Sequence, residues 1–200
     1  MSCRKSGVRN RSLCLVILTA LTGLAGCRTM DWTLQEAHIP CGAYRWRVKI
    51  LTDPDAASVR FEPIDTTVRG VIGFSPPPDF DRRQRNGNEF YVYRLTAQIV
   101  AVHVRLDQDL HLFLRDPDDP ELRMIAEIPN PKCAKNSRHD PEFAAARLVA
   151  ESVRSRGGRA LVEIVGVGFF DEYHEPKGGA PNGFELHPVL KLTEIEPVGR

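Results

Sequence analysis

The sequence predicts a mainly β protein built on a five-stranded barrel with one helix between its third and fourth strands. After residue 89, five stretches either alternate apolar with polar residues or are rich in Val, Ile, Tyr and Thr, which is typical of strands. One stretch of helical periodicity begins at Asp140, between the third and the fourth of these strands. This order of elements is the main argument for the fold class.

The chain begins with the three parts of a secretory signal peptide, over residues 1–26. The first part has no acidic residue and contains four basic ones, Arg4, Lys5, Arg9 and Arg11. The apolar stretch that follows, 13–24, is short for a membrane-spanning helix, which needs about 20 residues. Small residues then lead into Cys27. The pattern predicts export from the cytoplasm.

The sequence Leu24-Ala25-Gly26-Cys27 resembles the lipobox of bacterial lipoproteins. The resemblance implies that diacylglycerol is attached to the Cys27 sulfur, that the chain is cut before Cys27, and that a fatty acid such as palmitate acylates the new amino terminus. Such chains anchor a protein to a membrane without spanning it. Arg28, where some lipoproteins have Asp, favours the outer membrane of the bacterial envelope, facing the periplasm. The alternatives are an ordinary signal peptide and a retained anchor helix.

Cleavage would leave residues 27–200, which is enough chain for one domain with a sizeable core. Loss of the four basic residues leaves 23 Lys and Arg against 26 Asp and Glu, a net charge of −3. Because nucleic-acid binding depends on contacts between cations and phosphates, this charge argues against a nucleic-acid partner. We expect a polar tether over 27–40, an N-terminal β extension with a Pro-rich loop over 41–88, and a barrel domain over 89–198.

Processing also simplifies the cysteine count. Cys3 and Cys14 leave with the signal peptide and Cys27 carries lipid, so Cys41 and Cys133 are the two thiols left in an oxidising compartment. They are predicted to form one disulfide, and the alternative is a pair of buried free thiols. Neither has a cysteine neighbour at the spacing of a zinc site.

Two strands are predicted in the N-terminal extension. In the first, Trp46, Val48 and Ile50 alternate with basic residues, and the second is the apolar stretch 68–74. The Pro-rich and Arg-rich segment 75–88 follows, and its composition predicts a solvated loop at an internal boundary, with an anion-binding patch as the alternative.

The barrel strands are predicted over 90–104, 110–114, 124–128, 161–170 and 186–195. The helix begins with Asp140 and Pro141, ends at Gly157-Gly158, and places a set of mainly apolar residues on one face: Ala145, Leu148, Val149, Ser152 and Val153. This order resembles the OB fold, a Greek-key barrel of five strands with a helix between strands three and four. Gly166 and Gly168 suit a tight corner of such a barrel.

The C-terminal half also resembles a group of exported bacterial proteins that have no established activity. The matching segments are Asp109 to Leu112, Glu127 to Pro129, Gly166 to Asp171 with His174, and Ala180-Pro181-Asn182-Gly183-Phe184-Glu185-Leu186-His187-Pro188-Val189-Leu190. The loop after His174 departs from the Gly-Gln-rich sequence of these relatives. Because no activity is established for this group, the resemblance assigns no catalytic residue, and the sequence does not identify a cofactor.

Several polar residues are candidates for a binding or catalytic site at one end of the barrel: His111, Glu127, Asp171, His174 and His187. Imidazole and carboxylate groups suit a divalent metal that activates water, and the predicted ligands are His111, Asp171, His174 and His187. The same groups could supply a general base without metal. The alternative is structural: His187 hydrogen-bonds a loop backbone, and Asp171 and Asn182 shape that loop. We expect His38, His103 and His139 to lie in solvent or in packing.

Two functions are consistent with these features. The first is a lipid-anchored binding or structural module that holds a glycan, another small ligand or an envelope protein. Its expected binding face on the second and third strands carries His111, Phe113, Arg115, Ile125 and Glu127. The second is a metal-dependent hydrolase, which requires the candidate histidines to converge. Convergence would favour the enzyme and dispersion would favour the binding module.

Overall fold

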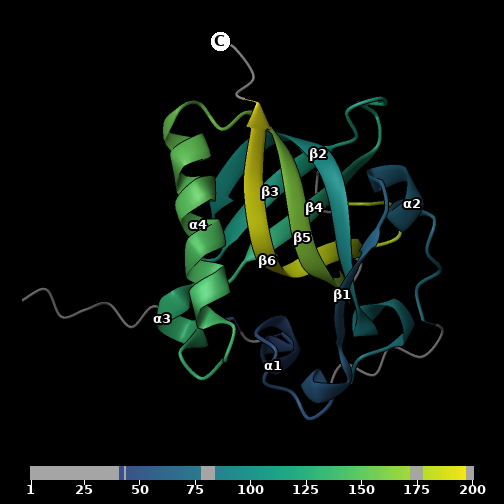
Figure 1. Cartoon of the computed structure of the whole chain (residues 1–200), viewed down its shortest axis with the longest axis vertical. Coiled ribbons are helices and arrows are strands. Elements are labelled where there is room, and N and C mark those ends of the chain that lie inside the picture. Colours follow the sequence, from purple (N-terminus) through teal and green to yellow (C-terminus); the bar gives the residue numbers. More distant parts are fainter. Residues whose placement is uncertain (1–40, 43, 78–83, 172–177, 197–200) are drawn as a thin grey trace, which may run out of the picture. The chain divides into compact units, whose positions relative to one another are not determined.

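A computed structural model of the chain describes residues 41–42, 44–77, 84–171 and 178–196 (Figure 1). Every described residue belongs to the same unit of the chain. The predicted signal peptide and tether, with Cys27 and His38, lie outside the described residues, and so does His174.

Five strands close into a barrel, which confirms the predicted OB-like fold (Figure 1). They are β2 (Tyr91–Val104), β3 (Leu110–Arg115), β4 (Arg123–Ile128), β5 (Ala160–Phe170) and β6 (Phe184–Glu196). Their order is β2-β3-β4-β6-β5, and pairing between β5 and β2 closes the ring. β4 and β6 run parallel, while the other neighbours in the ring are antiparallel.

Period-two alternation explains why these segments form barrel strands. Leu110, Leu112 and Leu114 are fully buried in the main core, where they meet the inward residues of β4, Met124 and Ala126. β2 is the longest strand because its second half pairs with β3 while its first half pairs with β5. The residues of β3 and β4 between these inward positions must therefore point away from the barrel interior.

The helix α4 (Asp140–Ser155) follows the short helix α3 (Pro131–Ala134) and packs beside β6 (Figure 1). Its buried residues are Phe143, Ala146, Ala150 and Val153, whereas Leu148 is 69% exposed. The predicted face was therefore right at Val153 and Val149, which packs half-buried against the core, and wrong at Ala145, Leu148 and Ser152, which are exposed. Ala146 and Ala150 in the buried stripe let the helix lie close to the barrel. The packing gained by this close approach outweighs the burial of the larger Leu148 side chain that the other face would give.

The N-terminal extension differs from the predicted pair of strands. The first segment forms helix α1 (Trp46–Lys49) and the second forms helix α2 (Val68–Ile72), in which the Thr67 hydroxyl accepts a hydrogen bond from the Gly70 amide. The strand of the extension is instead β1 (Arg60–Asp65), which lies outside the ring and pairs parallel to β2. Short 3₁₀ turns at Ala56–Ser58 and Gly87–Phe90 complete the described elements.

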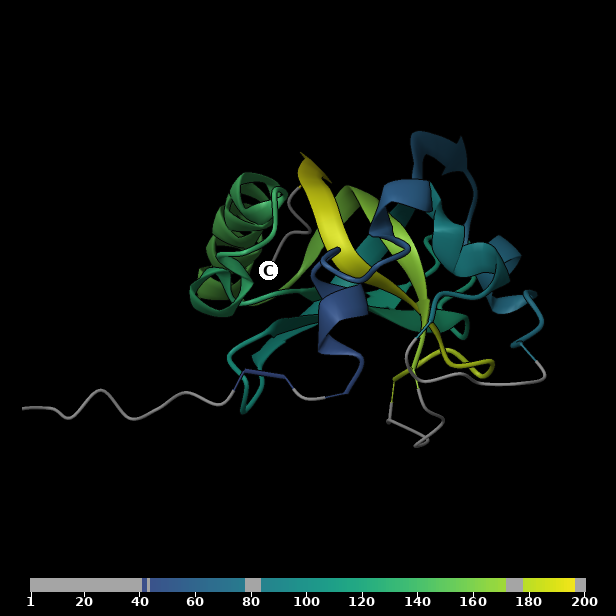
Figure 2. The same cartoon turned by 90° about the horizontal axis from the view of Figure 1, so that it is seen from below.

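The extension covers part of the outer barrel surface. Ile50, Leu51 and Val59 pack in a second buried cluster against Val92, Val165 and other outward residues of β2 and β5. When the barrel is seen from below, α1 lies in front of β6 (Figure 2). The outward side chains beneath α1 are therefore shielded from water.

Two buried ion pairs fasten the extension to the barrel. Arg45 makes two 2.7 Å hydrogen bonds to the carboxylate of Glu89, which also accepts the Phe170 amide at 2.8 Å. Arg85 pairs with Asp53, at 2.8 Å between Nη2 and Oδ2, and donates to the Val48 carbonyl. Arg85 is thus buried, contrary to the solvated loop expected for 75–88, whereas Ser75, Pro76, Gln84 and Gly87 are exposed and residues 78–83 lie outside the described ones. The two pairs hold α1, and with it Lys49, over the barrel.

Candidate functional site

Three nitrogen atoms surround the carboxylate of Glu127 on the outer face of β4. His111 Nε2 lies 2.9 Å from Oε1, while His187 Nδ1 and Lys49 Nζ lie 2.9 Å and 3.7 Å from Oε2. We call these four residues, together with Asp109 and Glu185, the acid–histidine cluster. The candidates His111, Glu127 and His187 therefore converge, although they come from three strands.

Strand register produces this convergence. His111 of β3 is directly opposite Glu127 of β4 in the antiparallel ladder. On the other side of β4, β6 runs parallel with Glu185 beside Ile125, so His187 comes level with Glu127 two residues further along. All of these residues point outward, as predicted, but α1 covers them. Glu127 is consequently only 3% exposed and His187 is fully buried.

The cluster keeps Glu127 ionised and His187 neutral. Burial opposes the charge on Glu127, but His187, His111 and Lys49 together hold its pKa well below the ordinary value. Burial, with the nearby Lys49 ammonium, lowers the pKa of His187 to about 4. Burial also opposes the charge on Lys49, yet four carboxyl groups, those of Glu127, Glu185, Asp171 and Asp109, raise its pKa. Lys49 is therefore the internal counter-ion of Glu127.

Two further carboxyl groups hold their protons unusually tightly. Burial and repulsion from Asp107 raise the pKa of Asp109 to about 7, although the Asn130 amide donates a 2.6 Å hydrogen bond to its Oδ1. Burial and repulsion from Glu127 raise the pKa of Glu185 well above its ordinary value. Carboxyl groups thus outnumber the cations that face them.

Some buried polar atoms of the cluster lack hydrogen bonds within the described part of the chain. They are Glu185 Oε2 and both ring nitrogens of His187. His187 Nδ1 is close to Glu127, but the two groups are not aligned for a hydrogen bond. The His187 ring packs 5.6 Å from the Phe169 ring, between centroids. Since most buried polar groups in proteins are satisfied, this set requires an explanation.

A pocket of about 390 Å³ opens over the cluster. Its lining residues come from the extension, the β2–β3 turn, β3, β4 and the end of β5: Cys41, Gly42, Lys49, Arg105, Leu106, Asp107, His111, Glu127 and Asp171. Asp171 therefore lies in the same pocket wall as His111 and Glu127. The pocket gives the buried cluster access to solvent.

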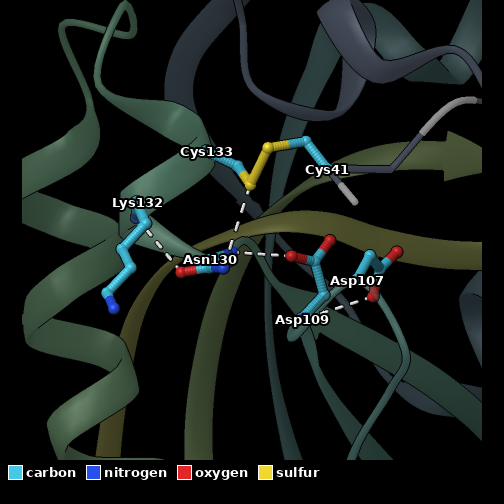
Figure 3. The surroundings of a disulfide bond; sticks show 6 residues. All are labelled: Cys41, Asp107, Asp109, Asn130, Lys132 and Cys133. Atoms are coloured by element: carbon cyan, nitrogen blue, oxygen red, sulfur yellow. Dashed lines mark hydrogen bonds between the residues drawn. A yellow bond between two sulfur atoms is a disulfide. The ribbon is translucent and has the colours of Figure 1, made fainter. Parts of the chain in front are cut away.

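The disulfide between Cys41 and Cys133 borders this site, which confirms the predicted pairing (Figure 3). The Cα atoms of the two cysteines lie 5.6 Å apart. Asn130 joins the disulfide to the cluster. Its side chain donates a hydrogen bond to Cys133 Sγ at 3.8 Å, and its backbone amide donates one to Asp109. The covalent link thus holds the start of the extension beside Asp109.

The described residues that come within reach of one metal ion are Asp109, Glu127 and His187, each of which offers a ligand atom within 4.8 Å of the others. This group shares His187 with the predicted ligand set, and His174 of that set lies outside the described residues. Sequence reasoning missed Asp109 and Lys49. Asp109 has the same strand parity as His111 and could have been found, whereas nothing local in the sequence brings Lys49 to β4.

The predicted structural roles are confirmed for some residues and wrong for another. Asn182 shapes its loop, since its side-chain amide donates to the carbonyls of Val71 and Phe74 at 3.0 Å. His103 and His139 pack against Phe113 and Phe61, each with ring centroids 4.9 Å apart. His187, in contrast, faces Glu127 and makes no hydrogen bond to the described loop backbone.

The expected binding face on β3 and β4 is divided in two. Ile125 is buried, and Glu127 contributes only to the wall of the pocket over the cluster, so neither belongs to an open face. Phe113 and Arg115 instead line a separate groove of about 450 Å³ with His103 and Arg123. The cause is α1, which covers one end of the face that the sequence predicted to be continuous.

Among the described residues, no helix is both long enough and apolar enough to cross a membrane. Comparisons with protein families, with curated proteins and with solved structures find no match to this chain.

Proposed function

We propose that this protein is a lipid-anchored binding module of the bacterial envelope that holds a small polar ligand, such as a glycan segment, in the pocket over the acid–histidine cluster. The pocket over His111, Glu127 and Lys49, with donors and acceptors in its wall, carries the proposal. The convergence of His111 and His187 on Glu127 favours the hydrolase, which is the second candidate because His174 of its predicted ligand set lies outside the described residues. A buried ionic group is often less favourable for stability than a hydrophobic one, so folding alone gives little reason for this arrangement. A pocket of about 390 Å³ falls in the range of small-ligand sites.

The chemistry of the pocket wall suits a ligand with many hydroxyl groups. Lys49 and Arg105 offer donors, while Asp107 and Asp171 offer acceptors, so one ligand face can make hydrogen bonds of both kinds. The mixture of charges gives no strong preference for a highly charged ligand. A nucleic-acid partner is disfavoured by the net charge of −3 expected for residues 27–200.

The pocket is tested by crosslinking in intact envelopes followed by capture of the protein. His111→Ala combined with Glu127→Gln, and separately Arg105→Ala at the exposed rim, should lose the crosslinked ligand. The matched control is Arg115→Ala, which lies in the separate groove and should retain it. Circular dichroism checks that each variant is folded. Equal ligand yield from all of these variants would contradict the proposal.

The lipid anchor is tested at Cys27. Cys27→Ser should stop incorporation of labelled fatty acid and release the protein from the membrane fraction, because sulfur is the site of lipid attachment. Cys14→Ser changes a cysteine within the predicted signal peptide and should have neither effect. Membrane retention of the Cys27→Ser protein would instead indicate a retained anchor helix.

A hydrolase is the second candidate. The observation that favours it is the 2.9 Å contact between His111 Nε2 and Glu127, because a carboxylate that orients an imidazole is the usual arrangement of a general base. His111 also lines the pocket, and the Lys49 ammonium could stabilise negative charge that develops on a substrate. A metal at the cluster would supply activated water. Hydrolysis of chromogenic esters and glycosides should then disappear in His111→Gln, and unchanged hydrolysis would exclude this role.

A further inference from the structure

We propose that Asp109, Glu127 and His187 form a binding site for a first-row divalent transition metal, with Zn²⁺ as the ion to test. Of the three, Glu127 lines the pocket over the cluster, while Asp109 and His187 are buried. The inference goes beyond the proposed function, since it rests on three buried side chains and not on the identity of the ligand above them.

The geometry of the three side chains is close to that of a metal site. Their ligand atoms lie within 4.8 Å of one another. Zinc ligands at about 2.0–2.2 Å from the ion require separations of roughly 3–3.5 Å between ligand atoms. His187 Nδ1 and Glu127 Oε2 are already 2.9 Å apart. Side-chain movements on the order of 1 Å, without a change of backbone, would therefore complete the site.

The surrounding residues orient the ligands as the outer shell of a metal site does. His111 lies against Oε1 of Glu127, which leaves Oε2 facing His187. The Asn130 amide donates to Oδ1 of Asp109 and so fixes that carboxyl group. Asn130 itself sits at the start of α3, next to the disulfide (Figure 3). Each carboxyl ligand therefore has a partner that sets its direction.

A second, independent observation points into the same site. Glu185 Oε2 and His187 Nδ1 are fully buried and have no hydrogen-bond partner among the described residues. Glu185 lies two residues before His187 on the same face of β6, where Glu127 repels its charge. Leaving such groups unsatisfied is costly. A cation beside them would offset that cost, and Glu185 would then offer a further carboxyl ligand.

The donor set selects the class of metal. Imidazole nitrogen combined with carboxylate oxygen suits zinc and its neighbours in the first row, whereas magnesium and calcium prefer oxygen ligands alone. We therefore expect Zn²⁺ to bind and Mg²⁺ not to compete at similar concentration.

Lys49 makes a specific prediction possible, because its positive charge would oppose a bound metal ion. Its ammonium lies 3.7 Å from Glu127 Oε2, where it would repel a bound cation. The side chain is 13% exposed and lines the pocket, so it can leave the cluster by turning into the pocket. The metal must displace Lys49, and removal of the ammonium should tighten metal binding.

The experiment is calorimetric titration of Zn²⁺ into the full-length protein, purified in detergent and freed of metal with a chelator. The wild type should bind one Zn²⁺ per chain. His187→Gln and Asp109→Asn should weaken binding at least tenfold, while Lys49→Met should strengthen it. Lys191→Met is the matched control, because Lys191 forms an exposed pair with Glu163 and should not change the affinity. Thermal unfolding of the metal-free variants shows whether each is folded.

Absence of stoichiometric Zn²⁺ binding by the wild type would overturn the proposal, as would equal binding by folded His187→Gln and Asp109→Asn. Weaker binding by Lys49→Met would overturn it too, because a structural role of Lys49 predicts that direction. Arg105→Ala, which changes the pocket rim without touching the three ligands, should bind Zn²⁺ normally. The proposed metal site and the proposed ligand pocket can therefore be contradicted independently of each other.

Discussion

At the scale of single residues, Glu127 shows how a solvent-facing strand position becomes a buried charge. Glu127 lies between the inward residues Ala126 and Ile128 of β4, so its side chain points out of the barrel. Helix α1 then covers it. Burial would favour the protonated acid, but two imidazoles and one ammonium reverse that preference. The charge is thus stabilised by residues from three different elements, β3, β6 and α1.

Asp109 should make stability depend on pH, in the protein kept free of metal with a chelator. Burial and Asp107 raise its pKa from 3.8 to about 7, with Glu127 adding to the increase and Lys49 opposing it. Between these values the folded state binds more protons than the unfolded state, so this group contributes a loss of stability as pH rises from 4 to 7. Asp109→Asn should remove that loss, which is at most about 4 kcal/mol.

Urea denaturation of wild type and Asp109→Asn at pH 4.5 and pH 8 measures the effect. The variant should gain more stability relative to wild type at pH 8 than at pH 4.5. The exposed Asp118→Asn is the control and should show the same difference from wild type at both pH values. A gain for Asp109→Asn that is equal at both pH values would contradict the assignment.

Residue patterns in the sequence were sufficient to orient His111, Glu127 and His187, because strand parity alone decides which side of a barrel wall a residue faces. They were not sufficient to show burial. That depends on Lys49 and α1, which lie more than 60 residues before β4 in the chain. The same alternation places Asp109 on the side of the barrel wall that His111 faces, so Asp109 could also have been predicted as a site residue.

At the scale of elements, the repeated alternation of the barrel strands was predictable, whereas the short segments of the N-terminal extension were not. The barrel strands, especially β2 with 14 residues, repeat their alternation often enough to exclude a helix. The stretches that became α1 and α2 have only 4 and 5 residues, which fit either period. Packing of the extension on the barrel decided between the two, and local sequence does not encode that contact.

Gly168 of β5 should not tolerate a side chain. A Cβ there would lie 2.5 Å from the Asn88 carbonyl oxygen and 2.9 Å from the Tyr93 ring. Because one of these neighbours is backbone, Gly168→Ala should destabilise the protein by about 1–3 kcal/mol, the usual cost of overpacking. Gly73→Ala is the control, since its nearest neighbour would be at 3.4 Å. Chemical denaturation measures the free energy of unfolding of both variants. If Gly168→Ala is as stable as Gly73→Ala, the backbone at Gly168 does not form a tight barrel corner.

At the scale of the whole molecule, the disulfide links the first described residues to the segment just before α4. Cys41 and Cys133 are separated by 92 residues, a span that includes β1 to β4. Chain-entropy arguments give about 4–5 kcal/mol for closing a loop of this length, as an upper value. This one bond can therefore contribute several kcal/mol to the stability of the fold.

Replacement of both cysteines by serine should lower the free energy of unfolding by up to about 4–5 kcal/mol. Because Cys41 lines the pocket and Cys133 contacts Asn130, ligand capture should fall as well. Guanidinium denaturation of the double variant, and of wild type with and without reductant, measures the first effect. The reduced wild type should have the same free energy of unfolding as the variant. If reductant does not change the stability of the wild type, the disulfide does not stabilise the fold as expected.

The position of β1 has a further consequence, for self-association. Ring closure leaves the described barrel strands paired, so β1 presents the unpaired edge of the sheet. Pro63 at its centre has no amide hydrogen to offer, and Arg60, Glu62 and Asp65 surround it with exposed charge. A strand from another molecule would find neither a continuous row of donors nor an uncharged surface there. The edge thus protects crowded copies of the protein from joining sheet to sheet into aggregates.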